Sequence, residues 1–339
     1  MSAGNPTERT ATGLYSFHMR QAIPSYLMAL AVGDLSFHSL GPRSGVYTEP
    51  SMLKASAWEF ADTERLISAA EALYGTYQWD RYDLLILPPS FPFGGMENPR
   101  LTFATPTIIA GDRSLVSLVA HELAHSWSGN LVTNADWNDF WLNEGFTVYF
   151  EQRILEAVFG RELAEMEASL DLQGLRQSVA DMGPTNSDTR LKLDLAGRDP
   201  DDGMNDIAYQ KGRFFLRAVE ASVGRPAFDA FLKKYFERHA FGSMTTEAFV
   251  DTLRRDLLEP TKSAFDPEVW IYRAGLPEIP EPSSDAFARV DRELAKRLAG
   301  TSPAQLDTHG WVTQQWLRFL RELPPTTTAN ELFALDAAF

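Results

Sequence analysis

The sequence predicts an α+β chain in which a small mixed β-sheet is followed by a mainly helical lobe and then by a further helical segment. Short runs typical of strands are concentrated in the first third of the 339 residues. Stretches with helical periodicity fill most of the remainder. A proline-rich run at 277–282 separates the last helical segment from the lobe and marks a domain boundary.

The expected strands follow from alternating or uniformly apolar runs bounded by Gly and Pro. Residues 91–99 contain several Gly and Pro residues and form a loop or an edge strand, and Pro106 favours an edge position for the strand that contains it. The strands are expected at 15–19, 26–32, 45–48, 82–87 and 101–107.

Helical periodicity and terminal glycines define the expected helices. An irregular stretch at 182–207 interrupts them, and a loop of this length is usually functional or mobile. The helices are expected at 51–73, 114–128 and 142–159, and beyond the proline-rich run at 285–299, 303–322 and 329–339.

Composition narrows the function. The formal net charge of −15 argues against nucleic acid and anionic membranes as partners, because both repel an acidic chain. The chain has no cysteine, so a metal must be held by His and carboxylate side chains. Residues 1–13 are expected to be a disordered leader without the apolar core of a signal peptide, and the longest apolar run, 26–32, is too short to span a membrane. We therefore expect a cytoplasmic protein.

The strongest chemical signal is His121-Glu122-Leu-Ala-His125, an H-E-x-x-H motif on a predicted helix. Residues four apart share one helix face, so both imidazoles can reach one metal ion. Two His ligands without Cys suit zinc, which also accepts a carboxylate. Glu144, near the start of the next helix, is the candidate third ligand. Taken alone, it is an acid that complements the helix dipole.

The segment from His121 to Glu144, with eighteen residues between His125 and Glu144, resembles the zinc signature of the gluzincin aminopeptidases, the family of aminopeptidase N. Upstream, Gly94-Gly95-Met96-Glu97-Asn98 resembles the G-x-M-E-N exopeptidase motif of that family. The run 88–151 is most similar to the leukotriene A(4) hydrolase/aminopeptidase branch. The resemblance covers roughly residues 14–280 and extends more weakly into the tail.

The resemblance implies a zinc-dependent aminopeptidase that acts on peptides with a free N-terminus and holds one Zn²⁺ per chain. His121, His125 and Glu144 are the implied ligands, and Glu122 is the implied general base that activates a water. Tyr209, in Ala-Tyr-Gln-Lys-Gly, is similar to the family tyrosine that stabilises the oxyanion. Glu97 is expected to bind the substrate α-ammonium, and the glycines beside it allow a substrate backbone to approach closely.

Asp201 matches a family aspartate that lines the pocket and favours basic N-terminal residues; alone, it is a solvated acid in an acidic turn. Met204 and Phe93 stand where the leukotriene branch has tyrosines, which weakens the case for epoxide chemistry. The implied organisation is a remnant of an N-terminal β domain at 14–50, a thermolysin-like zinc peptidase domain at 51–280 and a partial helical domain at 283–339. Most of the β domain and part of the helical domain are expected to be missing.

Two alternatives stay open beside the aminopeptidase. One is an impaired core that binds zinc or peptides without efficient turnover. The other is a different hydrolase, either an endopeptidase, against which Glu97 argues, or an epoxide hydrolase. The sequence leaves the oligomeric state open.

Overall fold

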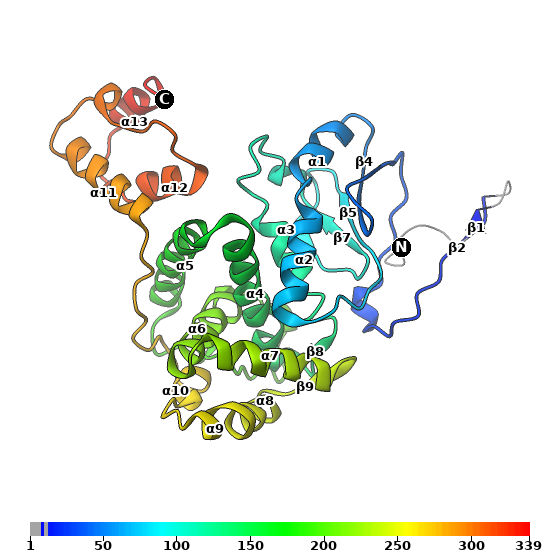
Figure 1. The fold of residues 1–339 in the computed structure, drawn as a ribbon. Coiled ribbons are helices and arrows are strands. Elements are labelled where there is room, and N and C mark those ends of the chain that lie inside the picture. The colour runs from blue at the N-terminus through cyan, green and yellow to red at the C-terminus, as the bar shows by residue number, and fades with distance from the viewer. Residues whose placement is uncertain (1–7, 10–12) are drawn as a thin grey trace.

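The computed structural model describes residues 8–9 and 13–339. Its architecture is the predicted α+β arrangement: a small mixed sheet, a large helical lobe and a group of helices at the C-terminal end (Figure 1). Most of the expected leader lies outside the described residues, although β1 (Glu8–Arg9) pairs with β2 (Tyr15–Ser16). None of the helices in the described part of the chain has both the length and the apolar character that a membrane span requires.

The main sheet has five strands in the order β3-β4-β5-β7-β6. Its three inner strands run parallel, and the two edge strands are antiparallel to their neighbours. Every residue of β5 is buried, as expected for a parallel strand covered on both faces. The bounds are β3 (Ser36–Ser39), β4 (Ser44–Thr48), β5 (Tyr82–Ile86), β6 (Gly95–Met96) and β7 (Leu101–Ala104).

Helices α2 (Thr63–Tyr74) and α3 (Ser117–Ala124) lie between the sheet and α4 (Trp141–Phe159) in Figure 1. The expected single helix at 51–73 is wrong, because α1 (Leu53–Glu59) ends before a turn that precedes α2. The Thr63 side chain donates a hydrogen bond to the Phe60 carbonyl oxygen, 2.7 Å away, and this bond stabilises the turn.

The helical lobe surrounds α4, which is buried on most of its faces. A second, two-stranded parallel sheet pairs β8 (Val132–Asn134) with β9 (Gly242–Met244). The remaining helices of the lobe are α5 (Arg161–Met182), α6 (Gly212–Val223), α7 (Arg225–His239), α8 (Thr246–Leu253), α9 (Glu259–Thr261) and α10 (Pro267–Ile271). Short helical turns are η1 (Ser25–Leu27), η2 (Pro106–Ile108), η3 (Trp137–Asp139), η4 (Ser187–Thr189), η5 (Pro200–Gly203), η6 (Ile207–Lys211) and η7 (Arg254–Leu258).

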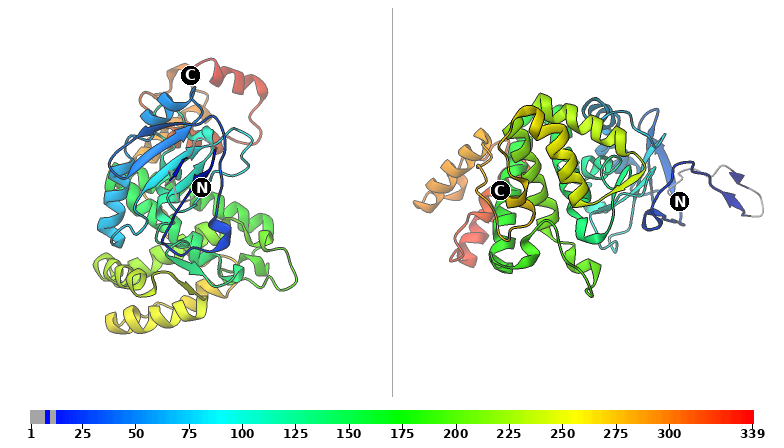
Figure 2. Two further views of the ribbon diagram at one scale, coloured as in Figure 1. Left: turned by 90° about the vertical axis from the view of Figure 1, so that its right-hand side faces the viewer. Right: turned by 90° about the horizontal axis from the view of Figure 1, so that it is seen from below.

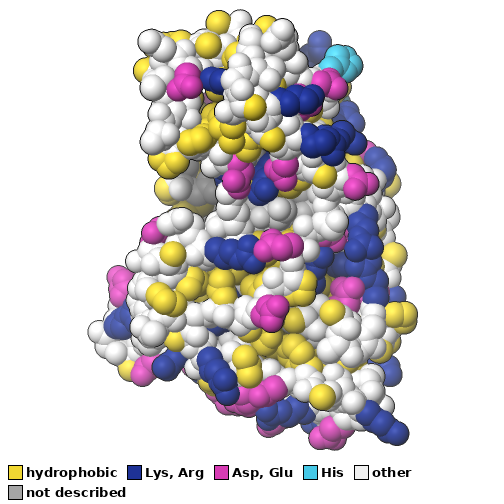
Figure 3. All heavy atoms as spheres, turned by 90° about the vertical axis from the view of Figure 1, so that its left-hand side faces the viewer, with side chains coloured by type: hydrophobic (Ala, Val, Ile, Leu, Met, Phe, Trp, Pro, Cys, Tyr) yellow, Lys and Arg dark blue, Asp and Glu magenta, His cyan; other side chains and the backbone are white. Residues whose placement is uncertain are grey.

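The C-terminal group contains α11 (Asp285–Leu298), α12 (Thr313–Arg321) and α13 (Ala329–Asp336) and packs against α5 (Figures 1 and 2). The expected helix 303–322 is wrong, because the short turn η8 (Pro303–Gln305) and an irregular segment precede α12. In that segment Gly310 has a φ of 73°, which interrupts helical geometry. Figure 3 shows this group at the top, with hydrophobic side chains on its surface between charged ones.

Two strand predictions are also wrong. Residues 26–32 form no strand: the segment starts with the turn η1 and then continues without a strand partner in the described chain. Its apolar side chains are largely exposed, and Val32 is 89% accessible, so the apolar run did not indicate a buried strand. Strand β7 lies between β5 and β6 rather than at an edge, because it ends at Ala104 and Pro106 belongs to the following turn.

Candidate metal centre

The two histidines of the H-E-x-x-H motif lie at the C-terminal end of α3. Its apolar residues are buried in the main core, which leaves the opposite side of the helix facing a cavity. His125 is the last residue with helical geometry, so its side chain still lies one turn above that of His121. Their Nε2 atoms are 3.2 Å apart. The two imidazoles therefore converge on one point, as the spacing predicts.

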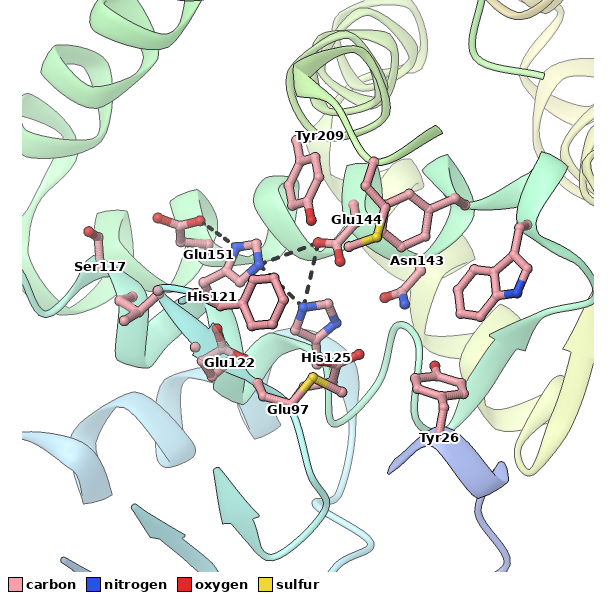
Figure 4. A pocket seen from close by; sticks show the side chains of 18 residues that line it. Tyr26, Glu97, Ser117, His121, Glu122, His125, Asn143, Glu144, Glu151 and Tyr209 are labelled. Atoms are coloured by element: carbon pink, nitrogen blue, oxygen red, sulfur yellow. Dashed lines mark hydrogen bonds and ion pairs between the residues drawn. The ribbon is translucent and has the colours of Figure 1, made fainter. Parts of the chain in front are cut away.

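Glu144 reaches the same point from the first turn of α4 (Figure 4). Its Oε2 atom is 3.4 Å from Nε2 of His121 and 3.6 Å from Nε2 of His125. The start of α4 is held in place by Ser128, whose hydroxyl donates to the carbonyl oxygens of Leu142 and Asn143. The loop after α3 thus fixes the position of the carboxylate relative to the histidines.

This geometry fits a zinc ion. Ligand atoms about 2.0–2.1 Å from a tetrahedral zinc lie about 3.3–3.4 Å from one another. The three distances between the Nε2 and Oε2 atoms match that value. The buried Oε2 atom of Glu144 also accepts no hydrogen bond from the described residues. A buried carboxylate oxygen without a donor is destabilising unless a cation occupies the site.

Outer hydrogen bonds orient both imidazoles. Oε2 of Glu151, two turns after Glu144 on α4, lies 3.0 Å from Nδ1 of His121. Nδ1 of His125 lies 3.2 Å from the Ser128 carbonyl oxygen and 3.1 Å from the Thr147 hydroxyl. Such contacts leave Nε2 as the nitrogen available to a metal. Burial lowers the pKa of His125 to about 4, which keeps the ring neutral, as a metal ligand must be.

Glu122 faces the cavity beneath strand β6. A Cβ atom on Gly95 would lie 2.0 Å from its Oε1, so only glycine at 95 leaves room for this carboxylate. Burial raises the pKa of Glu122 well above its usual range. A carboxyl group with a raised pKa can both take and return a proton near neutral pH.

Glu97 follows β6 and closes the same cavity, which has a volume of about 490 Å³. Its main-chain carbonyl oxygen accepts a hydrogen bond from Nδ2 of Asn130 at 2.8 Å. One oxygen each of Glu97 and Glu122 and a nitrogen of His125 lie within 4.8 Å of one another. Burial raises the pKa of Glu97 because it disfavours the charged form, and a cationic group placed between these carboxylates would offset that cost.

Tyr209 lies on the π-helical turn η6, and Figure 4 shows its hydroxyl directed towards Glu144. Its ring is stacked near that of His121, with centroids 6.3 Å apart. The turn can approach α4 this closely because Gly145 and Gly212 face each other. A Cβ on Gly145 would lie 2.8 Å from Cα of Gly212. Burial and the nearby carboxylates of Glu144 and Glu97 raise the pKa of Tyr209, which keeps the phenol protonated as a donor.

The structure brings most of the sequence-predicted site residues together. Asn98 is buried but is not among the residues that line the cavity. Asp201 is exposed on η5 and also lies outside the lining, whereas Met204 from the same segment contributes to it. The predicted residues that line the cavity are Gly94, Gly95, Met96, Glu97, His121, Glu122, His125, Glu144 and Tyr209.

Sequence reasoning missed several lining residues. Glu151 could have been found, because a position seven residues after Glu144 returns to the same helix face. Tyr26 had no such signal, since its segment was predicted to be a strand remote from the motif. The other missed lining residues are Ser117, Leu118, Trp137, Phe140 and Asn143.

The chain is similar to known proteins over most of its length. Residues 58–267 match the peptidase family M1 domain. A leukotriene A-4 hydrolase homolog from Botryotinia fuckeliana is 43% identical over 329 residues, which cover 94% of this chain and 50% of that protein. Leucine aminopeptidase 2 from Aspergillus terreus is 48% identical over 292 residues, which cover 84% of this chain and 47% of that protein.

Solved structures give the same picture. Yeast LTA4 hydrolase in complex with bestatin superimposes with a TM-score of 0.88 and 37% identity, covering 97% of this chain and 55% of that chain. An M1 zinc metallopeptidase from Deinococcus radiodurans gives a TM-score of 0.61 and 25% identity, covering 83% of this chain and 61% of that chain. The chain spans about half the length of the relatives it matches.

Proposed function

The chain belongs to peptidase family M1, and on that basis we propose that it is an aminopeptidase that removes the first residue from peptides with a free N-terminus. Its cofactor is Zn²⁺, for which His121, His125 and Glu144 are the proposed ligands. One observation carries the proposal: two further carboxylates, Glu97 and Glu122, lie beside these three ligands in one cavity. We propose residues 51–280 as the catalytic unit, and the family match at 58–267 supports this extent.

Glu122 is the proposed general base. A zinc ion at this site supplies a Lewis acid that polarises the scissile carbonyl and lowers the pKa of a water. Glu122 accepts the proton of the attacking water and delivers it to the leaving amine, a role that needs a carboxyl group with a raised pKa. The space above Gly95 allows its carboxylate to lie next to the scissile bond.

Glu97 is the proposed group that limits cleavage to the first bond. An α-ammonium near Glu97 also lies close to Glu122, so two negative charges offset the cost of its desolvation. Gly94, Gly95 and Met96 precede Glu97 at the sheet edge, where a substrate backbone can align as an additional strand. Asn98 lies beyond this edge, and its carbonyl oxygen accepts a hydrogen bond from the Leu101 N–H. Peptides with a blocked N-terminus lack the charge that this arrangement binds.

Tyr209 is the proposed donor to the oxyanion. Its phenol is protonated and lies on the side of the metal centre opposite β6, as Figure 4 shows. The removal of such a donor typically costs about 3–4 kcal/mol of transition-state stabilisation. A preference for basic N-terminal residues through Asp201 remains a hypothesis that depends on its segment moving towards the cavity, since Asp201 is exposed.

The test is a Glu122→Gln variant assayed with alanine and leucine p-nitroanilides. We expect hydrolysis to fall by about 10²–10⁴-fold, while elemental analysis still finds one zinc per chain. The same substrates carrying an N-acetyl group should not be cleaved by the wild-type protein. Undiminished activity in Glu122→Gln would overturn the proposed mechanism. Zinc-loaded wild-type protein without any turnover would support a binding core instead.

A further inference from the structure

A second cavity adjoins the metal cavity. It has a volume of about 550 Å³, close to the 490 Å³ of the metal cavity, and it opens towards the strands β8 and β9. The two cavities have two lining residues in common, Tyr26 of η1 and Trp137 of η3. These two side chains form a wall between the cavities, which we call the partition.

The partition is a packed aromatic structure. The rings of Tyr26 and Trp137 meet edge to face with centroids 5.5 Å apart. Trp137 contacts Phe140 in the same way at 6.0 Å, and Phe140 contacts Tyr209 at 5.9 Å. Such edge-to-face pairs are favourable beyond the area they bury. A continuous aromatic wall therefore runs from the N-terminal segment to the proposed oxyanion donor.

The partition stands at the end of the metal cavity where Glu97 lies. Figure 4 shows Tyr26 beside Glu97, with its hydroxyl directed into the cavity. The Tyr26 hydroxyl is buried without a hydrogen-bond partner in the described residues, and burial, followed by the charges of Glu97 and Glu144, raises the pKa of this phenol. Asn130, which lines the second cavity, donates to the Glu97 main chain at 2.8 Å. The second cavity thus begins directly behind the proposed ammonium site.

We propose that Tyr26 and Trp137 are specificity-determining residues, because the partition limits the length of the first side chain of the substrate. The proposal rests on the aminopeptidase function proposed above. A first side chain that extends from an α-ammonium at Glu97 towards the partition fits in the metal cavity when it is short and collides with the rings when it is long. Removal of either ring joins the two cavities and admits long side chains, including acylated lysines.

The test compares kcat/KM for alanine p-nitroanilide with kcat/KM for Nε-benzoyl-lysine p-nitroanilide. We expect Tyr26→Ala to raise the ratio of long to short substrate by about tenfold or more. Tyr26→Phe should leave the ratio unchanged, because the ring remains. Trp137→Leu removes the other ring of the partition and should also raise the ratio. Trp137 is partly exposed. The matched control is Phe241→Ala, since Phe241 lines only the second cavity.

A binding measurement separates this proposal from the proposed function. Dissociation constants of alanine hydroxamate and Nε-benzoyl-lysine hydroxamate are measured by calorimetry on the zinc-loaded protein, which requires no turnover. A shift of their ratio in Tyr26→Ala and Trp137→Leu supports the partition even if no substrate is cleaved. Unchanged ratios in both variants, or an equal shift in Phe241→Ala, would overturn it.

Discussion

The metal cavity has two walls that differ in how they are built. The first, here called the helical wall, consists of α3, α4 and η6 and carries the metal ligands, Glu151 and Tyr209. Each imidazole nitrogen that does not face the metal site has a hydrogen-bonding partner, and α4 meets the start of α6, directly after η6, at two facing glycines, Gly145 and Gly212. Small displacements in this wall would separate the three ligand atoms.

The second, the strand-and-loop wall, consists of β6, the turns η1 and η3, and Met204, which directly follows the turn η5. The Tyr26 hydroxyl of this wall is buried without a hydrogen-bond partner in the described residues. Exposed side chains such as Met204 and Phe93 also contribute to it. The comparison indicates that the helical wall fixes the chemistry, whereas the other wall adapts to the substrate and sets its selection.

The largest expected effect comes from a change that forces the helical wall apart. In Gly145→Ala the new Cβ would meet the Gly212 backbone at 2.8 Å, and a backbone cannot rotate away. We expect the free energy of unfolding, measured by urea denaturation, to fall by about 3 kcal/mol or more.

Gly174→Ala is the matched control, because Gly174 lies within α5 and a Cβ there meets no atom within 4 Å. Alanine should be neutral or stabilise this helix by about 0.5–1 kcal/mol. Equal stability of Gly145→Ala and the wild type would show that the two helices are not in close contact.

The difference between the two walls also explains which parts of the structure could be predicted from the sequence. Helix α4 was expected at 142–159 and spans Trp141–Phe159, because Gly160, with a φ of 95°, ends it locally. The H-E-x-x-H spacing sets the relative position of the two histidines through the helical repeat. The bounds of α4 and this spacing depend on residues near one another in the sequence, so local rules suffice, whereas Glu144 lies on the next helix and is positioned through the loop after α3.

The strand-and-loop wall depends on contacts between distant residues, which local rules do not describe. Tyr26 and Trp137 are 111 positions apart, yet their rings touch. The run 26–32 was apolar enough for a strand, but no neighbouring strand pairs with it in the described chain. Asp201 was placed by resemblance alone, and its exposure reflects the path of the irregular segment around η5.

A smaller effect is expected from Glu151→Gln, which loosens the helical wall without adding an atom. The amide cannot fix the His121 ring as the carboxylate does, so zinc affinity should fall by about 10–100-fold. Competition with a chromophoric chelator measures this change. Glu156→Gln is the control, because Glu156 is on the same helix but pairs with Arg225 away from the cavity. A loss of affinity in the control as large as in Glu151→Gln would contradict a specific role for Glu151.

The smallest effect, counted per pH unit, concerns Lys211, which anchors η6 behind Tyr209. Its fully buried Nζ donates to the carbonyl oxygens of Thr189 and Arg273, and burial lowers its pKa to about 7. Since the usual lysine pKa is about 10.4, the unfolded chain binds one more proton than the folded chain between about pH 7 and 10. This group therefore makes the free energy of unfolding rise with pH in that window, by up to about 1.4 kcal/mol per pH unit.

Lys211→Met should remove this contribution from the slope of unfolding free energy against pH, measured by urea titrations. Lys233→Met, at an exposed position on α7, should keep it. An identical slope in wild type and Lys211→Met would mean that the buried amine keeps its proton and that the charge is stabilised by the two carbonyl oxygens.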